Sequence, residues 1–387
     1  MDLFTFSWYV KEKEWMQMAD LFDYLRWRGD LKFSQVPPGP VDALIFSALS
    51  YLHFGGSVTE RPDIPISLRD AAVEFFEAEC PEGHCRVKTD LSLLQAAAET
   101  ERFGSTLLLQ YRNILIPEEE TQFAAITFLL DSNAAFVAFR GTDYTLTGWK
   151  EDFNMTFQES VPAQRLAARY VADVSARYPI PLYLGGHSKG GNLAVFSAVK
   201  SSPEVQNRIR TVYNHDGPGF TDYIMNDPAY LEILPRICTI IPQSSVIGML
   251  LEHREPYMVV KSKQIGLLQH DFYSWLLDGP AFIPMEEVTA DSKFLDRTIK
   301  EWLSGMDNTE RNEIVDTVFD LLSLGDAKSV FDLIQPKNVR TYLKTLSADG
   351  KLRKILSDEF MSLMEAARKT QLALEDFPAA AEDLPKT

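Results

Sequence analysis

The chain has 387 residues, of which 45% are hydrophobic and 24% are charged, a mixture typical of a globular protein. Its formal net charge of −17 at pH 7 argues against nucleic acid, whose phosphates select Lys and Arg, and against an anionic membrane surface. No run of about 18 apolar residues predicts a membrane span. No secretory signal is recognisable, and three cysteines are few and odd in number, so we expect a cytoplasmic protein.

The first 104 residues predict helices joined by turns. Apolar residues recur at helical spacing within residues 14–27, 41–54 and 91–103, and Ser67 and Asp90 are expected N-caps. Cys80, His84 and Cys85 stand close together, but no second pair follows at the spacing of a zinc site. We therefore expect this cluster to be structural.

From residue 105 onward, strands alternate with helices. Strands are predicted at residues 121–130, 134–139, 182–184, 209–213, 237–241 and 257–260, and helices at 162–178, 191–200, 221–234 and 272–277. This alternation is typical of an α/β fold with a mostly parallel sheet that helices cover. Beyond residue 285 the pattern is helical again, at residues 294–303, 308–324 and 339–375. We thus expect a helical part at 1–104, an α/β core at 105–285 and a helical part at 286–387.

A glycine-rich motif joins the strand at 182–184 to the helix at 191–200. Gly186-His187-Ser188-Lys189-Gly190 matches the nucleophile elbow, a sharp turn that holds a strained, exposed serine. Glycine is needed on both sides because strand and helix approach too closely for a Cβ. Ser188 is therefore the candidate nucleophile, and the Lys189 backbone N–H at the helix N-terminus is a candidate oxyanion donor. The alternative is a glycine-rich turn with an inert serine.

A second oxyanion donor should come from the loop after an earlier strand. A Phe-Arg-Gly-Thr segment closes the strand at 134–139, and its Thr142 offers a backbone N–H or a hydroxyl. An ordinary strand-end turn is the alternative. Asp152 follows at helical spacing, and we interpret it as a structural pin for the elbow, with Lys189 as its candidate partner.

These motifs resemble those of class 3 lipases, a group of α/β hydrolases. The resemblance is carried by the Phe-Arg-Gly-Thr segment with Trp149 and Asp152 after it, and by Gly-His-Ser-Lys-Gly-Gly around Ser188. A closer resemblance is to an uncharacterised bacterial lipase-like family. It is carried by Asn-Leu-Ala, which continues the motif around Ser188, by Asp216-Gly-Pro-Gly-Phe and by Gln-His270-Asp. In that family lysine follows the serine, where typical lipases have leucine or glutamine. The resemblance covers about residues 36–285 and implies a lipase-like hydrolase.

The candidate base is one of the histidines after the elbow, because triad order on this fold is serine, acid, histidine. His215 follows the strand directly after the elbow, which is early for a base, and His253 lies in a charged segment that we expect to be solvated. His270 follows the last strand, where the fold places its histidine, and is the predicted base. We expect His187 to be a packing residue.

The acid departs from the lipase pattern. Class 3 lipases carry it after the penultimate core strand, but the segment after residue 241 holds Gln243, Ser244 and Ser245 and no carboxylate. Asp216, one strand earlier, is the predicted acid and would hold His270 in the correct tautomer. Two alternatives stay open: Asp216 forms an Asx turn into the following Gly-Pro-Gly, or one of the two serines orients the histidine.

Together these residues predict a serine ester hydrolase of the lipase type. Ser188 would attack an acyl ester or a lipid, and His270, oriented by Asp216, would take and return the proton. Backbone groups of Lys189 and Thr142 would bind the oxyanion. No metal or organic cofactor is implied. The rival interpretation is an interaction protein that kept the fold but lost efficient catalysis, which the missing carboxylate after residue 241 and the helical C-terminal part favour.

Overall fold

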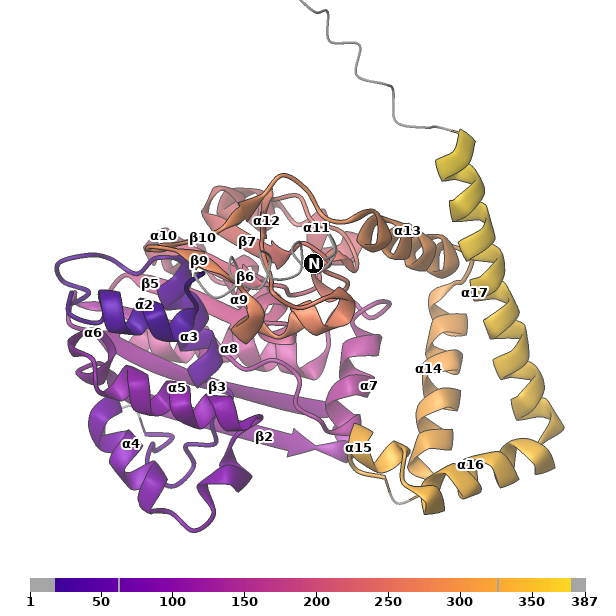
Figure 1. Cartoon of the computed structure of the whole chain (residues 1–387), viewed down its shortest axis with the longest axis horizontal. Coiled ribbons are helices and arrows are strands. Elements are labelled where there is room, and N and C mark those ends of the chain that lie inside the picture. The colour runs from indigo at the N-terminus through magenta and orange to yellow at the C-terminus, as the bar shows by residue number, and fades with distance from the viewer. Residues whose placement is uncertain (1–17, 62, 326, 377–387) are drawn as a thin grey trace, which may run out of the picture. The chain divides into compact units, whose positions relative to one another are not determined.

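The computed structural model describes residues 18–61, 63–325 and 327–376. Its contacts divide the chain into two compact units, Met1–Val288 and Thr289–Thr387 (Figure 1). The first unit holds a large sheet together with the helices that precede it in sequence, and the second is helical. Of the helix predicted at residues 14–27, residues 14–17 lie outside the described residues, and the remainder contains α2 (Leu21–Arg28).

A nine-stranded sheet forms the centre of the first unit, with β1 to β8 in chain order and β11 at the far edge. Neighbours from β1 to β4 are antiparallel, those from β4 to β8 are parallel, and β11 is antiparallel to β8. The fold is therefore α/β, and the part of the sheet from β4 to β8 is parallel, as in an α/β hydrolase. The strands are β1 (Ile66–Ser67), β2 (Leu107–Ile116), β3 (Thr121–Leu130), β4 (Ala134–Phe139), β5 (Leu182–His187), β6 (Ile209–His215), β7 (Ile237–Pro242), β8 (Tyr257–Val260) and β11 (Pro284–Met285).

Strands β3, β4 and β8 have the predicted bounds, whereas the sequence pattern did not indicate β2. The register between β2 and β3 shifts between Leu109 and Arg112, where Gln110 has φ +53°. This bulge breaks the period of two that a strand prediction depends on.

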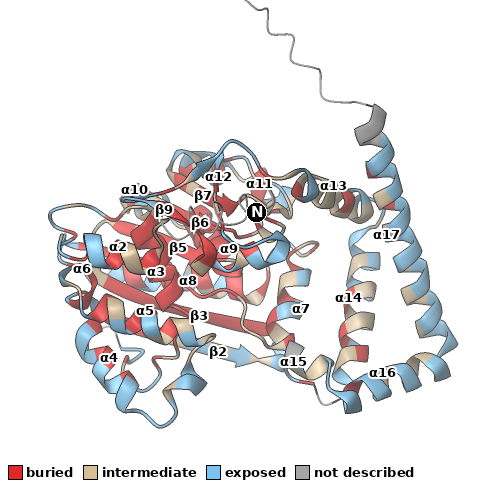
Figure 2. Ribbon diagram, viewed as in Figure 1, coloured by how far each residue is buried: buried red, intermediate tan, exposed pale blue. Residues whose placement is uncertain are grey.

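Helices cover both faces of the sheet because its strands carry large apolar side chains on both sides. Within β4, Phe136 packs with the N-terminal helices, and Val137 packs with the helices that connect the parallel strands. In Figure 2 the central strands and α3 are largely buried. One face is covered by α2, α3 (Pro40–Leu49), α4 (Leu68–Glu77), α5 (Lys88–Ala98) and α6 (Glu101–Gly104), and the other by α8 (Pro162–Arg177), α9 (Lys189–Val199), α11 (Asp222–Met225) and α12 (Pro228–Ile233).

Three predicted helices differ from the structure. Asp90 is not an N-cap but the third residue of α5, where its carboxylate accepts the N–H groups of Arg86 and Val87. That helix ends at Ala98, and Thr100 caps the separate helix α6. The helix predicted at 221–234 is interrupted before α12, and the one predicted at 272–277 is only the 3-10 turn Phe272–Ser274.

In its described residues, the second unit is built of helices. They are α13 (Ala290–Ser304), α14 (Asn308–Ser323), α15 (Val330–Leu333), α16 (Pro336–Ala348) and α17 (Gly350–Asp376). Helix α13 packs against α17, where Lys369 Nζ lies 3.3 Å from Glu301 Oε1. The Tyr342 hydroxyl of α16 donates to the Leu322 carbonyl of α14 at 2.9 Å. The single helix expected at 339–375 is thus two helices, separated at Asp349.

No helix among the described residues is long and apolar enough to cross a membrane. Cys80, Cys85 and Cys238 are free thiols. Across residues 18–61, 63–325 and 327–376, no group of three or more His, Cys, Asp or Glu side chains is arranged to hold a metal ion.

Candidate active site

Ser188 lies between the end of β5 and the start of α9. Its backbone has φ +58° and ψ −133°, a region that residues with a Cβ rarely occupy and that costs of order 1–3 kcal/mol. A Cβ on Gly186 would lie 2.2 Å from the Gly190 carbonyl carbon, so only glycine lets strand and helix approach this closely. The chain therefore forms the strand–turn–helix geometry of a nucleophile elbow.

His270 and Asp216 meet beside this turn, although 54 positions separate them in the sequence. His270 ends the 3-10 turn Gly266–His270, and its Nδ1 lies 2.6 Å from Oδ2 of Asp216, which follows β6. A carboxylate oxygen only accepts, so Nδ1 of the neutral ring carries the proton and Nε2 keeps its lone pair. The Asp216 side chain is fully buried, whereas that of His270 is 29% exposed. This tautomer is the one that a general base requires.

The Asp216 carboxylate is held by the loop after β7, the place from which the lipase pattern would supply the acid. Its Oδ1 accepts the Ser245 hydroxyl at 2.5 Å and the Gly248 N–H at 3.2 Å. A Cβ on Gly248 would lie 2.4 Å from that oxygen, so glycine makes room for the carboxylate. Ser245 thus supports Asp216 rather than replacing it, and the Ser244 N–H donates to the Gln269 side chain. Sequence reasoning missed Gly248.

The side chain of Asn214, and not that of Asp216, holds the start of the Gly-Pro-Gly loop. Asn214 Oδ1 accepts the Gly217 N–H at 2.9 Å, and its Nδ2 donates to the Gly217 carbonyl. Asp216 has φ +52°, and its own N–H donates to the Ile240 carbonyl at 2.8 Å. The carboxylate of Asp216 is therefore directed to His270 and to the loop after β7.

Ser188 and His270 are brought together by their neighbours. His187 Nε2 lies 2.9 Å from the His270 carbonyl, and the Ser188 N–H donates to the His215 carbonyl, directly before Asp216. Within the described residues, neither the Ser188 hydroxyl nor His270 Nε2 has a hydrogen-bond partner, so no bond joins them. Such bonds are often long in the absence of substrate and tighten in the complex.

The other histidines behave differently from a base. Burial lowers the pKa of His215 to about 4, which keeps that fully buried ring neutral. The prediction that His253 is solvated is wrong: its side chain is 8% exposed, and Nδ1 lies 2.9 Å from Glu255 Oε1. Glu255 also accepts the hydroxyls of Tyr230 and Thr239, so its buried charge is satisfied, and His253 is drawn into this network.

The loop that follows β4 runs against the nucleophile. A Cβ on Gly141 would lie 3.1 Å from the Ser188 Cβ and 2.2 Å from the Tyr51 hydroxyl, so only glycine permits this approach. In the described part of the chain, the backbone N–H groups of Thr142 and Lys189 have no acceptor. Unpaired backbone donors near a nucleophile are what an oxyanion hole requires, so these two N–H groups remain its candidate donors.

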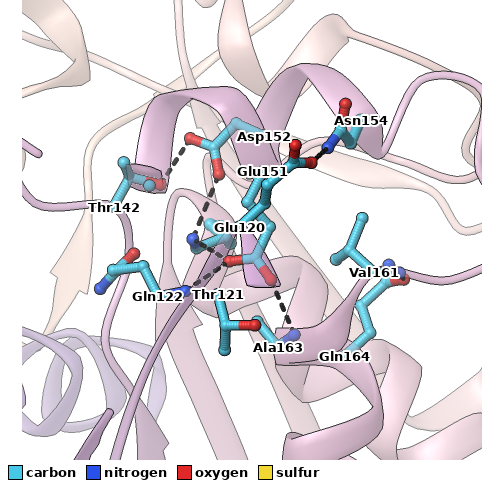
Figure 3. Close-up of polar contacts among 12 residues, drawn as sticks. Glu120, Thr121, Gln122, Thr142, Glu151, Asp152, Asn154, Val161, Ala163 and Gln164 are labelled. Carbon is cyan, nitrogen blue, oxygen red and sulfur yellow. Dashed lines mark hydrogen bonds and ion pairs between the residues drawn. The ribbon is translucent and has the colours of Figure 1, made fainter. Parts of the chain in front are cut away.

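The side chain of Lys189 is buried in a network of carboxylates on α7 (Leu146–Asn154), part of which Figure 3 shows. Its Nζ lies 3.0 Å from Glu151 Oε2 and 3.4 Å from Asp152 Oδ1. Asp152 Oδ2 accepts the Thr142 hydroxyl at 2.5 Å, as expected of a pin between loop and elbow. Burial alone would lower the pKa of Lys189, but Asp152 and Glu151 outweigh it and raise that pKa.

Glu151 is the member of this network that sequence reasoning missed. It is fully buried and accepts the backbone N–H groups of Gln122 and Ala163, at 3.0 and 2.8 Å, besides Lys189 Nζ. The signal was the lysine itself, because an ammonium group enclosed by an elbow needs an anion within reach. Glu151 therefore joins β3, α8 and the elbow.

The sheet and the elbow define a protein of the α/β-hydrolase fold class. The chain belongs to the Mbeg1-like family, whose model matches residues 97–320, more than half of the sequence. That match includes Ser188, Asp216, His270 and the donors around them. No curated protein sequence matches the chain significantly.

Solved structures similar to this chain include several fungal lipases. The Rhizomucor miehei lipase–propeptide complex is 14% identical, with 58% of this chain and 68% of that chain covered, at a TM-score of 0.35. A triacylglycerol lipase from Penicillium expansum is 11% identical, with 45% and 75% covered, at a TM-score of 0.29. Lipase II from Rhizopus niveus is 11% identical, with 37% and 63% covered, at 0.26. At these values the likeness carries no functional argument, and the fold is assigned from the sheet itself.

Proposed function

We propose that this protein is a serine ester hydrolase that acts through an acyl-enzyme at Ser188. The observation that carries the proposal is the Asp216–His270 pair, whose 2.6 Å contact leaves His270 Nε2 unprotonated on a residue whose backbone carbonyl contacts His187, next to Ser188. Family membership does not by itself assign an activity, so the argument depends on this geometry.

The proposed reaction has two halves. Ser188 Oγ attacks the ester carbonyl carbon while His270 Nε2 takes the hydroxyl proton, and Asp216 balances the imidazolium. The N–H groups of Thr142 and Lys189 receive the oxyanion, and its collapse breaks the ester bond as His270 returns the proton to the leaving alcohol. Water then attacks the acyl-enzyme by the same route, which frees the acid and restores Ser188.

An apolar acyl substrate, either a simple ester or a lipid, fits the surface next to the base. On the turn that leads to His270, the side chains of Ile265, Leu267 and Leu268 are 79%, 64% and 62% exposed. Exposed neighbouring apolar side chains commonly mark a binding surface. Turnover of p-nitrophenyl esters of graded chain length should show the preference, and Leu267→Ser with Leu268→Ser should shift it toward shorter chains. A cytoplasmic location remains a prediction from the cysteine content.

A fluorophosphonate probe tests the proposal, because only an activated serine reacts with it. We expect the wild-type protein to label at Ser188, and Ser188→Ala to lose labelling and ester turnover with its thermal midpoint nearly unchanged. Ser197→Ala, a buried serine on the same helix α9, is the matched control and should label normally. Labelling at another serine would refute the assignment.

The second candidate function is a catalytically weak or inactive interaction protein. It is favoured by the absence of a hydrogen bond between Ser188 and His270 in the described residues, and by the helical second unit. A folded wild-type protein that does not react with the probe would support it.

A further inference from the structure

Two buried side chains, His187 and Tyr51, form a chain of hydrogen bonds that ends at the backbone carbonyl of His270. The ring of His187 is buried, with Nε2 2.9 Å from the His270 carbonyl and Nδ1 2.9 Å from the Tyr51 hydroxyl. A carbonyl oxygen only accepts, so Nε2 carries the proton and Nδ1 accepts the Tyr51 hydroxyl. The two partners therefore fix one tautomer and one orientation of His187.

The surroundings of His187 keep it neutral. Burial and, after it, the nearby His270, Arg86 and His215 hold the pKa of His187 well below its ordinary value. These groups come from the turn after β8, from the segment before α5 and from β6, and Tyr51, just after α3, completes the set. A neutral ring here does not oppose the positive charge that His270 acquires during the proposed reaction.

His187 also contacts the base through its ring. The centroids of the His187 and His270 rings lie 4.5 Å apart at an interplanar angle of 37°, and Phe272 meets His187 edge-on at 4.9 Å. The Arg86 guanidinium lies over the Tyr51 ring at 4.9 Å and over Phe272 at 5.1 Å. Both the backbone and the ring of His270 are thus restrained by the same side chain.

We propose that Tyr51 and His187 are positioning residues for His270, holding its backbone and ring so that Nε2 faces Ser188. The proposal depends on the hydrolase function proposed above and extends it to the N-terminal helices, because Tyr51 follows α3. Neither residue touches the reacting atoms. Each acts by fixing the orientation of the His270 ring relative to Ser188, because proton transfer depends on that orientation.

Substitutions at the two residues test this role in the full-length protein. Tyr51→Phe should lower kcat about five- to tenfold, the equivalent of one hydrogen bond, with KM within about twofold. His187→Phe keeps a ring but loses both bonds and should lower kcat further, and His187→Gln, which retains a donor for the His270 carbonyl, should restore part of it. The control is Tyr170→Phe, which removes an equally buried hydroxyl between α8 and β2 and should leave kcat unchanged.

A measurement without substrate separates failure of this proposal from failure of the hydrolase function. In ¹⁵N-histidine spectra of the wild-type protein, His187 should be the Nε2–H tautomer and remain neutral at pH 5. In Tyr51→Phe the His270 resonances should shift or broaden, whether or not the protein hydrolyses esters. A proton on His187 Nδ1, unaltered His270 resonances in Tyr51→Phe, or a folded His187→Phe protein with wild-type kcat would overturn the proposal.

Discussion

The buried pair Lys189–Glu151 gives the sharpest prediction on stability. The two side chains are 1% and 0% exposed, so neither charge is solvated when its partner is removed. Breaking such a pair costs about 3–5 kcal/mol, whereas replacing both charges by neutral groups of similar size is often close to neutral. We therefore expect the free energy of unfolding to fall by that amount in Lys189→Met.

For Glu151→Gln we expect the loss of unfolding free energy to lie near the lower end of this range. Asp152, 3.4 Å from Lys189 Nζ, remains to balance the ammonium group, and its side chain is 34% exposed. The double variant should lose less than the sum of the two single losses, with a coupling of about 2–3 kcal/mol between the sites. The exposed pair Lys88–Glu82, with side chains 80% and 61% exposed, supplies the control, and Lys88→Met should change stability by less than about 1 kcal/mol.

The suitable assay is unfolding in urea, with hydrogen exchange of individual peptides as the readout. Peptides from β3 to β5 report on the first unit alone, so unfolding of the helical second unit does not enter the measured midpoint. Single-variant losses no larger than that of Lys88→Met, or additive losses in the double variant, would refute the argument that this buried pair joins α7 to the elbow.

Three further outcomes are expected. Asp216→Asn should reduce turnover by up to about 10⁴-fold, because the amide neither fixes the His270 tautomer nor balances its charge; a loss of only a few-fold would return the role to the serines after β7. The pKa of buried His215 is lowered to about 4, so the unfolded chain takes up a proton below about 6.5 that the folded protein excludes. His215 should therefore contribute a loss of stability of up to about 3 kcal/mol as pH falls from 6.5 to 4, and His215→Phe should remove this contribution in pH-dependent urea unfolding. Gly186→Ala should keep strand and helix from approaching at the elbow, seen as a lowered thermal midpoint and loss of probe labelling; a variant with both unchanged would contradict the close approach of Gly186 to Gly190.

Local chemistry in the sequence determined the α/β class and the elbow. Apolar runs bounded by turn residues placed β3, β4 and β8, and glycines at fixed offsets from Ser188 identified a strand-to-helix turn, because each signal depends on residues near one another in the chain. The same reasoning failed at β2, where a bulge interrupts the alternation, and at His253, whose charged neighbours suggested solvent. His253 contacts Glu255, whose other hydroxyl partners, Tyr230 and Thr239, are distant in sequence.

Only the tertiary structure decided which groups surround Ser188. From the sequence, Asp216 could be the acid or form an Asx turn, and Ser244 or Ser245 could take its place. The structure shows that Asn214 holds the Gly-Pro-Gly loop and that Ser245 and Gly248 hold the Asp216 carboxylate. Asp152 was the predicted partner of Lys189 and contacts it, but Glu151, adjacent on the same helix, is the nearer and more deeply buried partner, which the sequence could not indicate. Both outcomes follow from the cost of burying a charge without partners, and those partners lie on separate strands and loops that meet only when the sheet forms.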